Sequence, residues 1–140
     1  MFYYITVTTE CDLKCTYCYG KVCEDFGSDF RDLRIDYDIP TSIRYDVEDL
    51  KAFLERDPCP TIIFYGGEPL LRIDKIEEIM DQIQAEKYVI QTNGLHLEDI
   101  APRHLKRLNS ILVSIDGTEK QTDENRGRGT YKKLYRTSRR

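Results

Sequence analysis

Three cysteines lie close together near the start of the chain, in the segment CDLKCTYC. Cys11, Cys15 and Cys18 have the spacing C-x3-C-x2-C, which lets three thiolates converge on one compact ion or cluster. Structural zinc usually takes four ligands in two pairs, and no second pair follows here. A cube of four irons held by three thiolates would instead leave one iron open, as a reactive centre requires. Candidates for a fourth ligand are Cys23, Cys59, His96 and His104.

The composition indicates one small globular domain. The chain has 140 residues, 40% hydrophobic and 33% charged, so it can bury a core. No apolar run approaches the about 18–20 residues that span a bilayer, and MFYYITVTT at the N-terminus lacks the features of a signal peptide. We therefore expect a cytoplasmic protein with no membrane partner. In a reducing compartment, clustered cysteines are metal ligands or catalytic thiols more often than disulfides, and a count of five fits a disulfide framework poorly.

The charge is unevenly distributed along the chain. The net charge is −4, but residues 126–140 hold seven Lys and Arg and no acid, which leaves −11 for the first 125 residues. A basic tail can bind nucleic acid. Because no aromatic-interleaved groove or recognition helix accompanies it, we interpret the tail as a solvated helix and expect no nucleic-acid partner.

Four apolar segments have the length and the β-branched or aromatic content of strands. They are residues 2–8, 61–65, 88–91 and 110–115, and a shorter alternating run at 33–39 indicates a further strand. Helical patterns alternate with the four main segments about every 25 residues. This alternation indicates βαβ units, so we predict an α/β fold with a parallel sheet.

The helices between these strands have recognisable starts. Asp74 begins a strongly periodic helix, with Glu77 three residues later in a capping-box arrangement. A helix around residues 100–108 would be broken near Pro102. The remaining helices are predicted to begin at Asp46 and near Thr130.

Glycine-rich or reactive motifs follow each of the four strands. The cysteine loop follows the first, and GGEP (66–69), TNG (92–94) and SIDG (114–117) follow the others. Ligands of parallel α/β folds bind at the carboxyl ends of the strands. Tight turns alone could explain TNG, but four such motifs at one edge of the sheet favour a binding site.

As a set, these motifs resemble those of the radical S-adenosylmethionine (SAM) superfamily. CDLKCTYC is similar to its C-x3-C-x-aromatic-C motif, and GGEP, TNG, SIDG and NRGRGTY (125–131) follow in the order that the family uses. The resemblance covers the chain except residues 20–45. It implies a partial TIM barrel of parallel β/α units. Residues 1–140 would form the N-terminal portion of this core domain, with about four of six units and without the closing strands or an auxiliary-cluster domain.

The resemblance also implies the chemistry of the site. Cys11, Cys15 and Cys18 would each bind one iron of a [4Fe–4S] cluster, and the amino and carboxylate groups of SAM would chelate the fourth iron. An electron from an external low-potential donor would cleave SAM reductively. The products would be methionine and a 5′-deoxyadenosyl radical that abstracts hydrogen from a substrate.

Charged and polar residues of the later motifs would then bind SAM. By the resemblance, Glu68 would accept a charge-assisted hydrogen bond from the ammonium group of SAM, and Arg126 would make a planar, bidentate contact with its carboxylate. Ser114 would contact the ribose, where Asp116 either helps or only shapes the turn.

Smaller and aromatic residues complete the expected site. Gly66 and Gly67 have no Cβ, so the backbone could approach the cofactor closely. Asn93 would line the pocket, and Tyr17 would lie near the adenine. The residues expected to lie outside the site are the buried cysteines Cys23 and Cys59 and the surface histidines His96 and His104.

The segments IFYGGEPLL, IQTNG and VSIDG resemble most closely the branch of the family that modifies peptides and proteins, including enzymes of archaea. A peptide or protein substrate is therefore expected. Two alternatives stay open: a non-catalytic metal-binding module, and an inactive, truncated remnant of such an enzyme.

Overall fold

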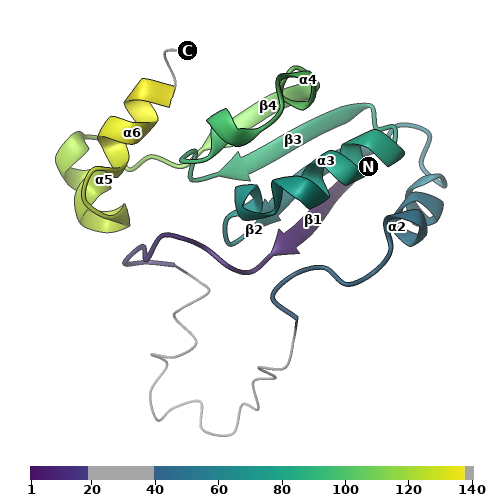
Figure 1. Ribbon diagram of the computed structural model, residues 1–140, viewed down its shortest axis with the longest axis horizontal. Coiled ribbons are helices and arrows are strands. Elements are labelled where there is room, and N and C mark those ends of the chain that lie inside the picture. The colour runs from purple at the N-terminus through teal and green to yellow at the C-terminus, as the bar shows by residue number, and fades with distance from the viewer. Residues whose placement is uncertain (19–39, 138–140) are drawn as a thin grey trace, which may run out of the picture.

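The computed structural model describes residues 1–18 and 40–137, and a parallel four-stranded sheet forms its centre (Figure 1). The strands pair in chain order, and every pair is parallel, as predicted. The expected strand at 33–39 lies outside the described residues. The four strands are β1 (Phe2–Thr8), β2 (Thr61–Gly66), β3 (Lys87–Thr92) and β4 (Leu108–Val113).

Helices connect the strands and follow the last one. In Figure 1, α3 and α4 lie on the same face of the sheet, and α5 and α6 lie beyond the carboxyl end of β4. None of the described helices is long and apolar enough to cross a membrane. The helices are α2 (Val47–Leu54), α3 (Ile73–Gln82), α4 (Pro102–Leu105), α5 (Glu119–Arg126) and α6 (Thr130–Thr137), with the 3-10 helices η2 (Pro69–Arg72) and η3 (Leu97–Asp99).

The core fills the space between the sheet and the helices α2 and α3. Ile62 and Phe64 of β2 are fully buried and lie in register with Tyr88 and Ile90 of β3, so all four share one face of the sheet. The rings of Phe64 and Tyr88 stack with 6.4 Å between their centroids. Burial of each large apolar side chain contributes about 1.5–3 kcal/mol. The helix α3 supplies the facing residues Ile76, Ile79 and Met80.

The strand β4 is far more exposed than β2 or β3. Ile111, Leu112 and Val113 are 39%, 51% and 40% exposed. An apolar cavity of about 480 Å³ lies between this strand and α6, where Leu134 and Tyr135 line it. Among the described residues β4 pairs only with β3, so its outer edge is open.

The start of α3 differs from the prediction. The helix begins at Ile73, one residue before Asp74, and no side-chain cap is present. Asp74 accepts two hydrogen bonds from Arg72, at 2.9 and 2.8 Å. Glu77 does not complete a capping box. Its Oε1 accepts a hydrogen bond from the backbone N–H of Ala101 at 2.9 Å, so it ties α3 to the connection that precedes α4.

The segment before β4 also differs from the prediction. Pro102 does not break a helix but begins the short α4, where its missing N–H would have had no partner. Leu108, expected on a helix, is the first residue of β4. The helix α5 was not predicted, because it has no apolar stripe. Its sequence signal is the capping box between Thr118 and Gln121.

Two residues expected outside the site lie in unexpected surroundings. His104 is fully buried, with its Nε2 2.8 Å from Asp81 Oδ1 and its Nδ1 3.2 Å from Glu77 Oε1, so the prediction of a surface histidine was wrong. The hydrogen bond between Nε2 and Asp81 ties α4 to α3, whereas the buried Nδ1 makes no hydrogen bond to any of the described residues. Cys59 is exposed rather than buried, and Cys23 lies outside the described residues.

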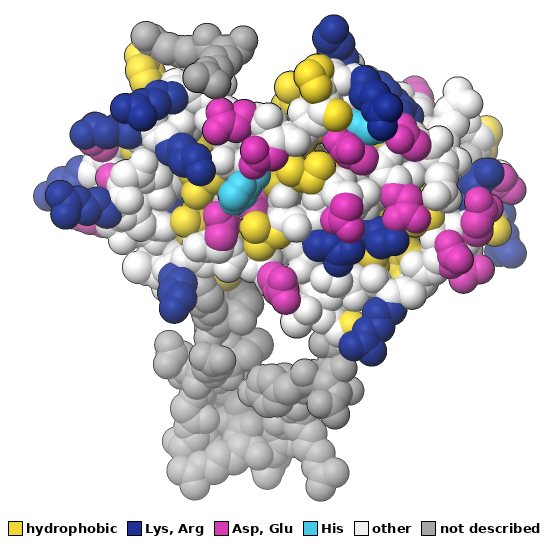
Figure 2. Space-filling model, viewed as in Figure 1, with side chains coloured by type: hydrophobic (Ala, Val, Ile, Leu, Met, Phe, Trp, Pro, Cys, Tyr) yellow, Lys and Arg dark blue, Asp and Glu magenta, His cyan; other side chains and the backbone are white. Residues whose placement is uncertain are grey.

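Figure 2 shows the face that the helices cover. Lys and Arg side chains gather over α5 and α6, whereas basic and acidic side chains are interspersed over the rest of this face. Of the basic residues at 126–140, Lys132, Lys133 and Arg136 lie on α6, whereas Arg139 and Arg140 lie outside the described residues.

Candidate functional site

A cavity of about 480 Å³ lies at the carboxyl ends of the strands, where the sequence predicts the site. Glu68 and Asp116 are the two predicted site residues that do not line it. The structure brings the others together from segments that are far apart in the chain. The predicted residues that line the cavity are Cys11, Cys15, Cys18, Tyr17, Gly66, Gly67, Asn93, Ser114 and Arg126.

The two glycines of GGEP are needed by the path of the neighbouring chain. A Cβ on Gly66, whose φ is +146°, would lie 2.0 Å from the carbonyl oxygen of Thr8. A Cβ on Gly67 would lie 2.2 Å from the carbonyl oxygen of Glu10. The Gly67 N–H donates to the Thr8 carbonyl at 2.9 Å. Because Gly66 and Gly67 have no side chain, the backbone that leads into the cysteine loop can pass directly against them. This backbone constrains the two positions more tightly than the expected approach of a cofactor does.

The cysteine loop carries three partly exposed thiols. A turn brings its second half back, with the Cys18 N–H donating to the Cys15 carbonyl at 3.2 Å. Burial raises the pKa of the Cys11 thiol. The Leu13 N–H, 3.4 Å from Sγ, opposes this shift, and the nearby Asp12 carboxylate adds to it. Within residues 1–18 and 40–137, no group of three or more His, Cys, Asp or Glu side chains is arranged to hold a single metal ion.

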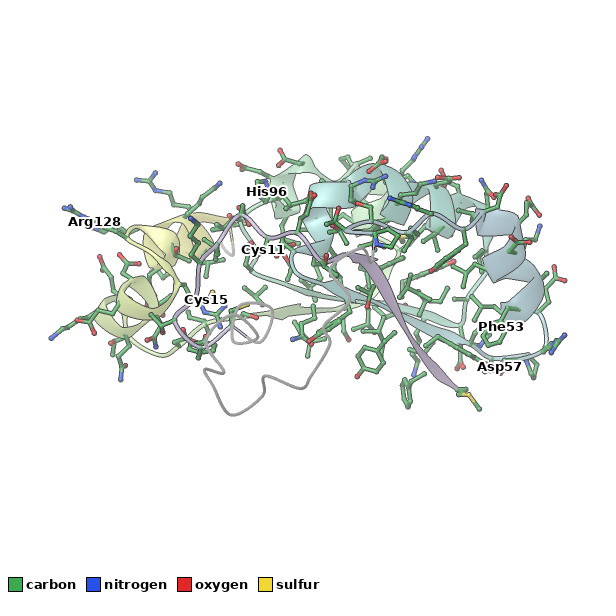
Figure 3. The ribbon with its side chains drawn as sticks, turned by 90° about the horizontal axis from the view of Figure 1, so that it is seen from below. Cys11, Cys15, Phe53, Asp57, His96 and Arg128 are labelled. Atoms are coloured by element: carbon green, nitrogen blue, oxygen red, sulfur yellow. The ribbon has the colours of Figure 1, made fainter. Side chains whose placement is uncertain are left out.

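Asp12 anchors the first half of this loop to the chain that follows β3. Figure 3 labels His96 of that following chain beside Cys11 of the loop. Asn93 donates to Asp12 Oδ1 at 2.8 Å, and His96 Nε2 lies 2.9 Å from Asp12 Oδ2. The other ring nitrogen of His96 lies 3.2 Å from Asp99. Burial alone would raise the pKa of Asp12, but the hydrogen bonds from His96 and Asn93 lower it. His96 was not among the predicted site residues. Its place two residues after TNG, at a strand end, is the signal that could have found it.

Glu68 is fully buried beneath the cavity. Its carboxylate accepts hydrogen bonds from the Leu70 N–H at 2.9 Å, the Thr92 hydroxyl at 2.7 Å and the Asn93 N–H at 2.6 Å. Desolvation raises its pKa, although these three donors oppose the shift. The carboxylate therefore joins the end of β2 to the end of β3, and it does not face the cavity.

Tyr17, Asp116 and Arg126, here called the Asp116 triad, join the cysteine loop to the chain after β4. Arg126 donates to Asp116 from Nε at 2.9 Å and from Nη2 at 3.0 Å. The Tyr17 hydroxyl lies 2.7 Å from Asp116 Oδ1 and also accepts a hydrogen bond from Arg126 Nη2. Burial and the hydrogen bond to Asp116 raise the pKa of Tyr17 to about 12. Beside this triad, the Thr16 N–H donates to the Asn125 carbonyl at 3.0 Å.

The family model of the radical SAM superfamily matches residues 5–140. The chain belongs to the radical SAM superfamily. The motifs that the sequence analysis singled out are thus those of an enzyme family whose cofactors are a [4Fe–4S] cluster and SAM.

The two relatives described next are much longer than this chain. An uncharacterized protein of Archaeoglobus fulgidus is 31% identical over 136 residues, which cover 95% of this chain and 30% of that protein. A probable GTP 3′,8-cyclase of Methanocella arvoryzae is 33% identical over 117 residues, or 80% of this chain and 34% of that protein. The chain therefore spans about a third of the length of these relatives.

A solved structure with bound AdoMet has the same fold. It is anSMEcpe with bound AdoMet and the Cp18Cys peptide, and it superposes with a TM-score of 0.66 at 22% sequence identity. The match covers 99% of this chain and 38% of that protein. The parallel sheet and its helices are therefore part of the partial TIM barrel of the superfamily, as predicted.

The residues around the cavity fit the two cofactors of the radical SAM family. Three thiols face one cavity, and each could bind a separate iron, so they need not converge on one ion. Iron binds the thiolate form of cysteine. Because the pKa of Cys11 is raised, its thiol is protonated before iron binds, and iron binding would release that proton. On another wall, the Arg126 guanidinium offers a cation to a carboxylate.

Proposed function

We propose that the chain forms the cofactor-binding part of a radical SAM enzyme that modifies a peptide or protein. The observation that carries the proposal is one cavity lined both by the three thiols and by Arg126. A structural metal module needs a closed ligand set, whereas these thiols are partly exposed on an open cavity.

In this proposal, Cys11, Cys15 and Cys18 hold the [4Fe–4S] cluster. When bound, the cluster supplies the electron that cleaves the sulfonium of SAM. Arg126 binds the carboxylate of SAM, and Ser114 faces the ribose. Ser114 is held in place because its N–H donates to the Thr92 carbonyl at 3.0 Å.

Glu68 has an indirect role in this proposal. Both its oxygens already accept hydrogen bonds within the protein. Its carboxylate holds the backbone of Asn93 and of Leu70, the residue directly after GGEP, in place. The neighbouring backbone of GGEP and TNG is then positioned to meet the ammonium of SAM. This role differs from the direct contact that the resemblance implies.

A peptide or protein substrate is supported by the sequence segments of the peptide-modifying branch. The solved structure of anSMEcpe contains a peptide as well as AdoMet. A nucleotide substrate is the second candidate, because one relative is a probable GTP 3′,8-cyclase. An external low-potential electron donor would serve either reaction.

We further propose that additional β/α units complete the barrel beside β4. The exposed apolar residues of β4 and the greater length of the relatives support this. Sequestration of a reactive intermediate requires a closed site. We therefore expect residues 1–140 alone to bind the cofactors but to turn over at most slowly.

Anaerobic reconstitution with iron and sulfide tests the proposal. We expect a [4Fe–4S] EPR spectrum that changes when SAM is added, and 5′-deoxyadenosine in the reduced sample. A protein that binds only zinc, or a cluster whose spectrum SAM leaves unchanged, would favour the non-catalytic module. A second experiment separates the two substrate classes. A deuterated peptide pool or deuterated GTP is added to a longer protein that includes this chain, and transfer of deuterium to 5′-deoxyadenosine is measured.

A further inference from the structure

Asp116 binds one edge of the Arg126 guanidinium and leaves the other edge uncommitted to it. The two hydrogen bonds from Nε and Nη2, at 2.9 and 3.0 Å, form the parallel pair typical of Arg–carboxylate contacts. A guanidinium has five N–H donors in a fixed plane, so Nη1 keeps both of its donors when Asp116 is bound in this way.

The two partners of this ion pair lie differently with respect to the cavity. Arg126 lines the cavity, whereas Asp116 does not. Asp116 therefore approaches the guanidinium from behind. A carboxylate that competed with a ligand for Arg126 would be expected on the cavity side.

Arg126 is held on several sides. The side chains of Arg126 and Asp116 are only 12% and 17% exposed. The Tyr17 hydroxyl accepts a hydrogen bond from Arg126 and donates to Asp116, and the guanidinium carbon lies 5.6 Å from the centre of the Tyr17 ring. A free arginine side chain has large rotamer entropy. Fixing it before a ligand arrives removes much of that cost from binding.

We propose that Asp116 is a positioning residue that fixes Arg126 for the carboxylate of SAM. Through Tyr17, it also couples the Arg126 side chain to the cysteine loop. The inference rests on the proposed function, because it takes SAM as the ligand. It assigns Asp116 no contact with SAM itself.

The test measures SAM binding to the reconstituted, cluster-loaded protein by equilibrium dialysis. The variants are Asp116→Ala, Arg126→Ala and the double variant. The control is Asp74→Asn, which removes the charge from another bidentate Asp–Arg pair, with hydrogen bonds of 2.9 and 2.8 Å, neither member of which lines the cavity. Iron content and thermal midpoint are checked for each protein first. 5′-Methylthioadenosine, which lacks the amino-acid part of SAM, serves as the second ligand.

We expect Asp116→Ala to weaken SAM binding about tenfold, because an unfixed arginine must be ordered on binding. It should leave 5′-methylthioadenosine binding unchanged, and Asp74→Asn should change neither. In the Arg126→Ala background, Asp116→Ala should have no further effect, because Asp116 acts through Arg126. Tyr17→Phe should weaken SAM binding less than Asp116→Ala does.

Three results would overturn the inference while leaving the proposed function in place. They are tighter SAM binding by Asp116→Ala, an additive effect in the double variant, and an equal loss of 5′-methylthioadenosine binding. If Asp116→Ala fails to fold, Asp116→Asn and Arg126→Lys replace it. Arg126→Lys keeps the charge without the planar fork, so it should weaken SAM binding and make Asp116→Asn silent in its background. A wild-type protein that holds the cluster but binds no SAM would instead refute the proposed function.

Discussion

Glu68, just after β2, and Arg126, at the end of α5, are both charged residues of the family's motifs, yet the fold surrounds them differently. Glu68 is fully buried, and three donors of the chain bind its carboxylate. Arg126 lines the cavity, and its ion-pair partner among the described residues, Asp116, does not line it. A charged residue in a motif is thus not necessarily a ligand contact. The number of hydrogen bonds that the chain already makes to it decides what remains for a ligand.

The largest effect is expected from substitution of the thiols, against which the effects at Glu68 and Arg126 can be compared. Cys11→Ala, Cys15→Ala or Cys18→Ala should each abolish [4Fe–4S] assembly, because each thiolate would bind one iron. Cys59→Ala is the matched control, since Cys59 is exposed and remote from the cavity. Iron and sulfide content measures this. Full loading of a single Cys11, Cys15 or Cys18 variant would contradict the ligand set.

The next effect is on folding. Glu68→Ala should lower the free energy of unfolding by about 3 kcal/mol, because it leaves three buried donors without a partner. Glu86→Ala, at an exposed glutamate, should change it by less than about 0.5 kcal/mol. Urea unfolding of the cluster-free proteins measures both. A stable Glu68→Ala protein that has lost SAM binding would return Glu68 to the role of a direct ligand.

Arg126→Ala should show the opposite pattern. It should keep the cluster but weaken SAM binding about ten- to a hundredfold, because the loss of a charge-assisted contact costs about 1.5–3 kcal/mol. Titration of SAM against the EPR signal of the reduced cluster measures the affinity. Unchanged affinity would mean that Arg126, like Glu68, serves only the fold.

The smallest effect is the pH dependence of the Glu68 contribution. Desolvation raises the pKa of Glu68 above 4.5, its ordinary value. A carboxyl whose pKa is higher in the folded than in the unfolded chain stabilises the fold below the unfolded pKa, and this contribution is lost as the pH rises through the folded pKa. The stability of the wild type relative to Glu68→Gln should therefore decrease as the pH rises above 4.5. Urea unfolding of both proteins across this range checks the sign, and a difference that increases with pH would contradict it.

The sequence predicted the features that depend on local pattern. Alternation of strands and helices predicted the parallel sheet, the motif after the first strand predicted the thiols, and the family resemblance predicted Arg126. The position of α5 was missed because a short polar helix has no apolar period. The capping-box sequence at Thr118 was the signal that could have predicted it.

The environment of individual polar residues could not be predicted. Glu77 was expected to cap its own helix, but it binds the backbone of Ala101, which a different connection brings to it. His104 was expected at the surface, but it is fully buried and its Nε2 is hydrogen-bonded to Asp81 of α3. Such burial depends on partners that only the tertiary fold supplies, so the sequence around each residue does not contain it.

The contact between Tyr17 and Arg126 joins residues 109 positions apart. During synthesis the N-terminal residues emerge first, so the cysteine loop leaves the ribosome long before its arginine partner exists. The loop can meet GGEP earlier, through the bond between Thr8 and Gly67, but the wall formed by the Asp116 triad closes only after residue 126 has emerged. The order of translation thus leaves the three thiols without this wall until residue 126 has emerged.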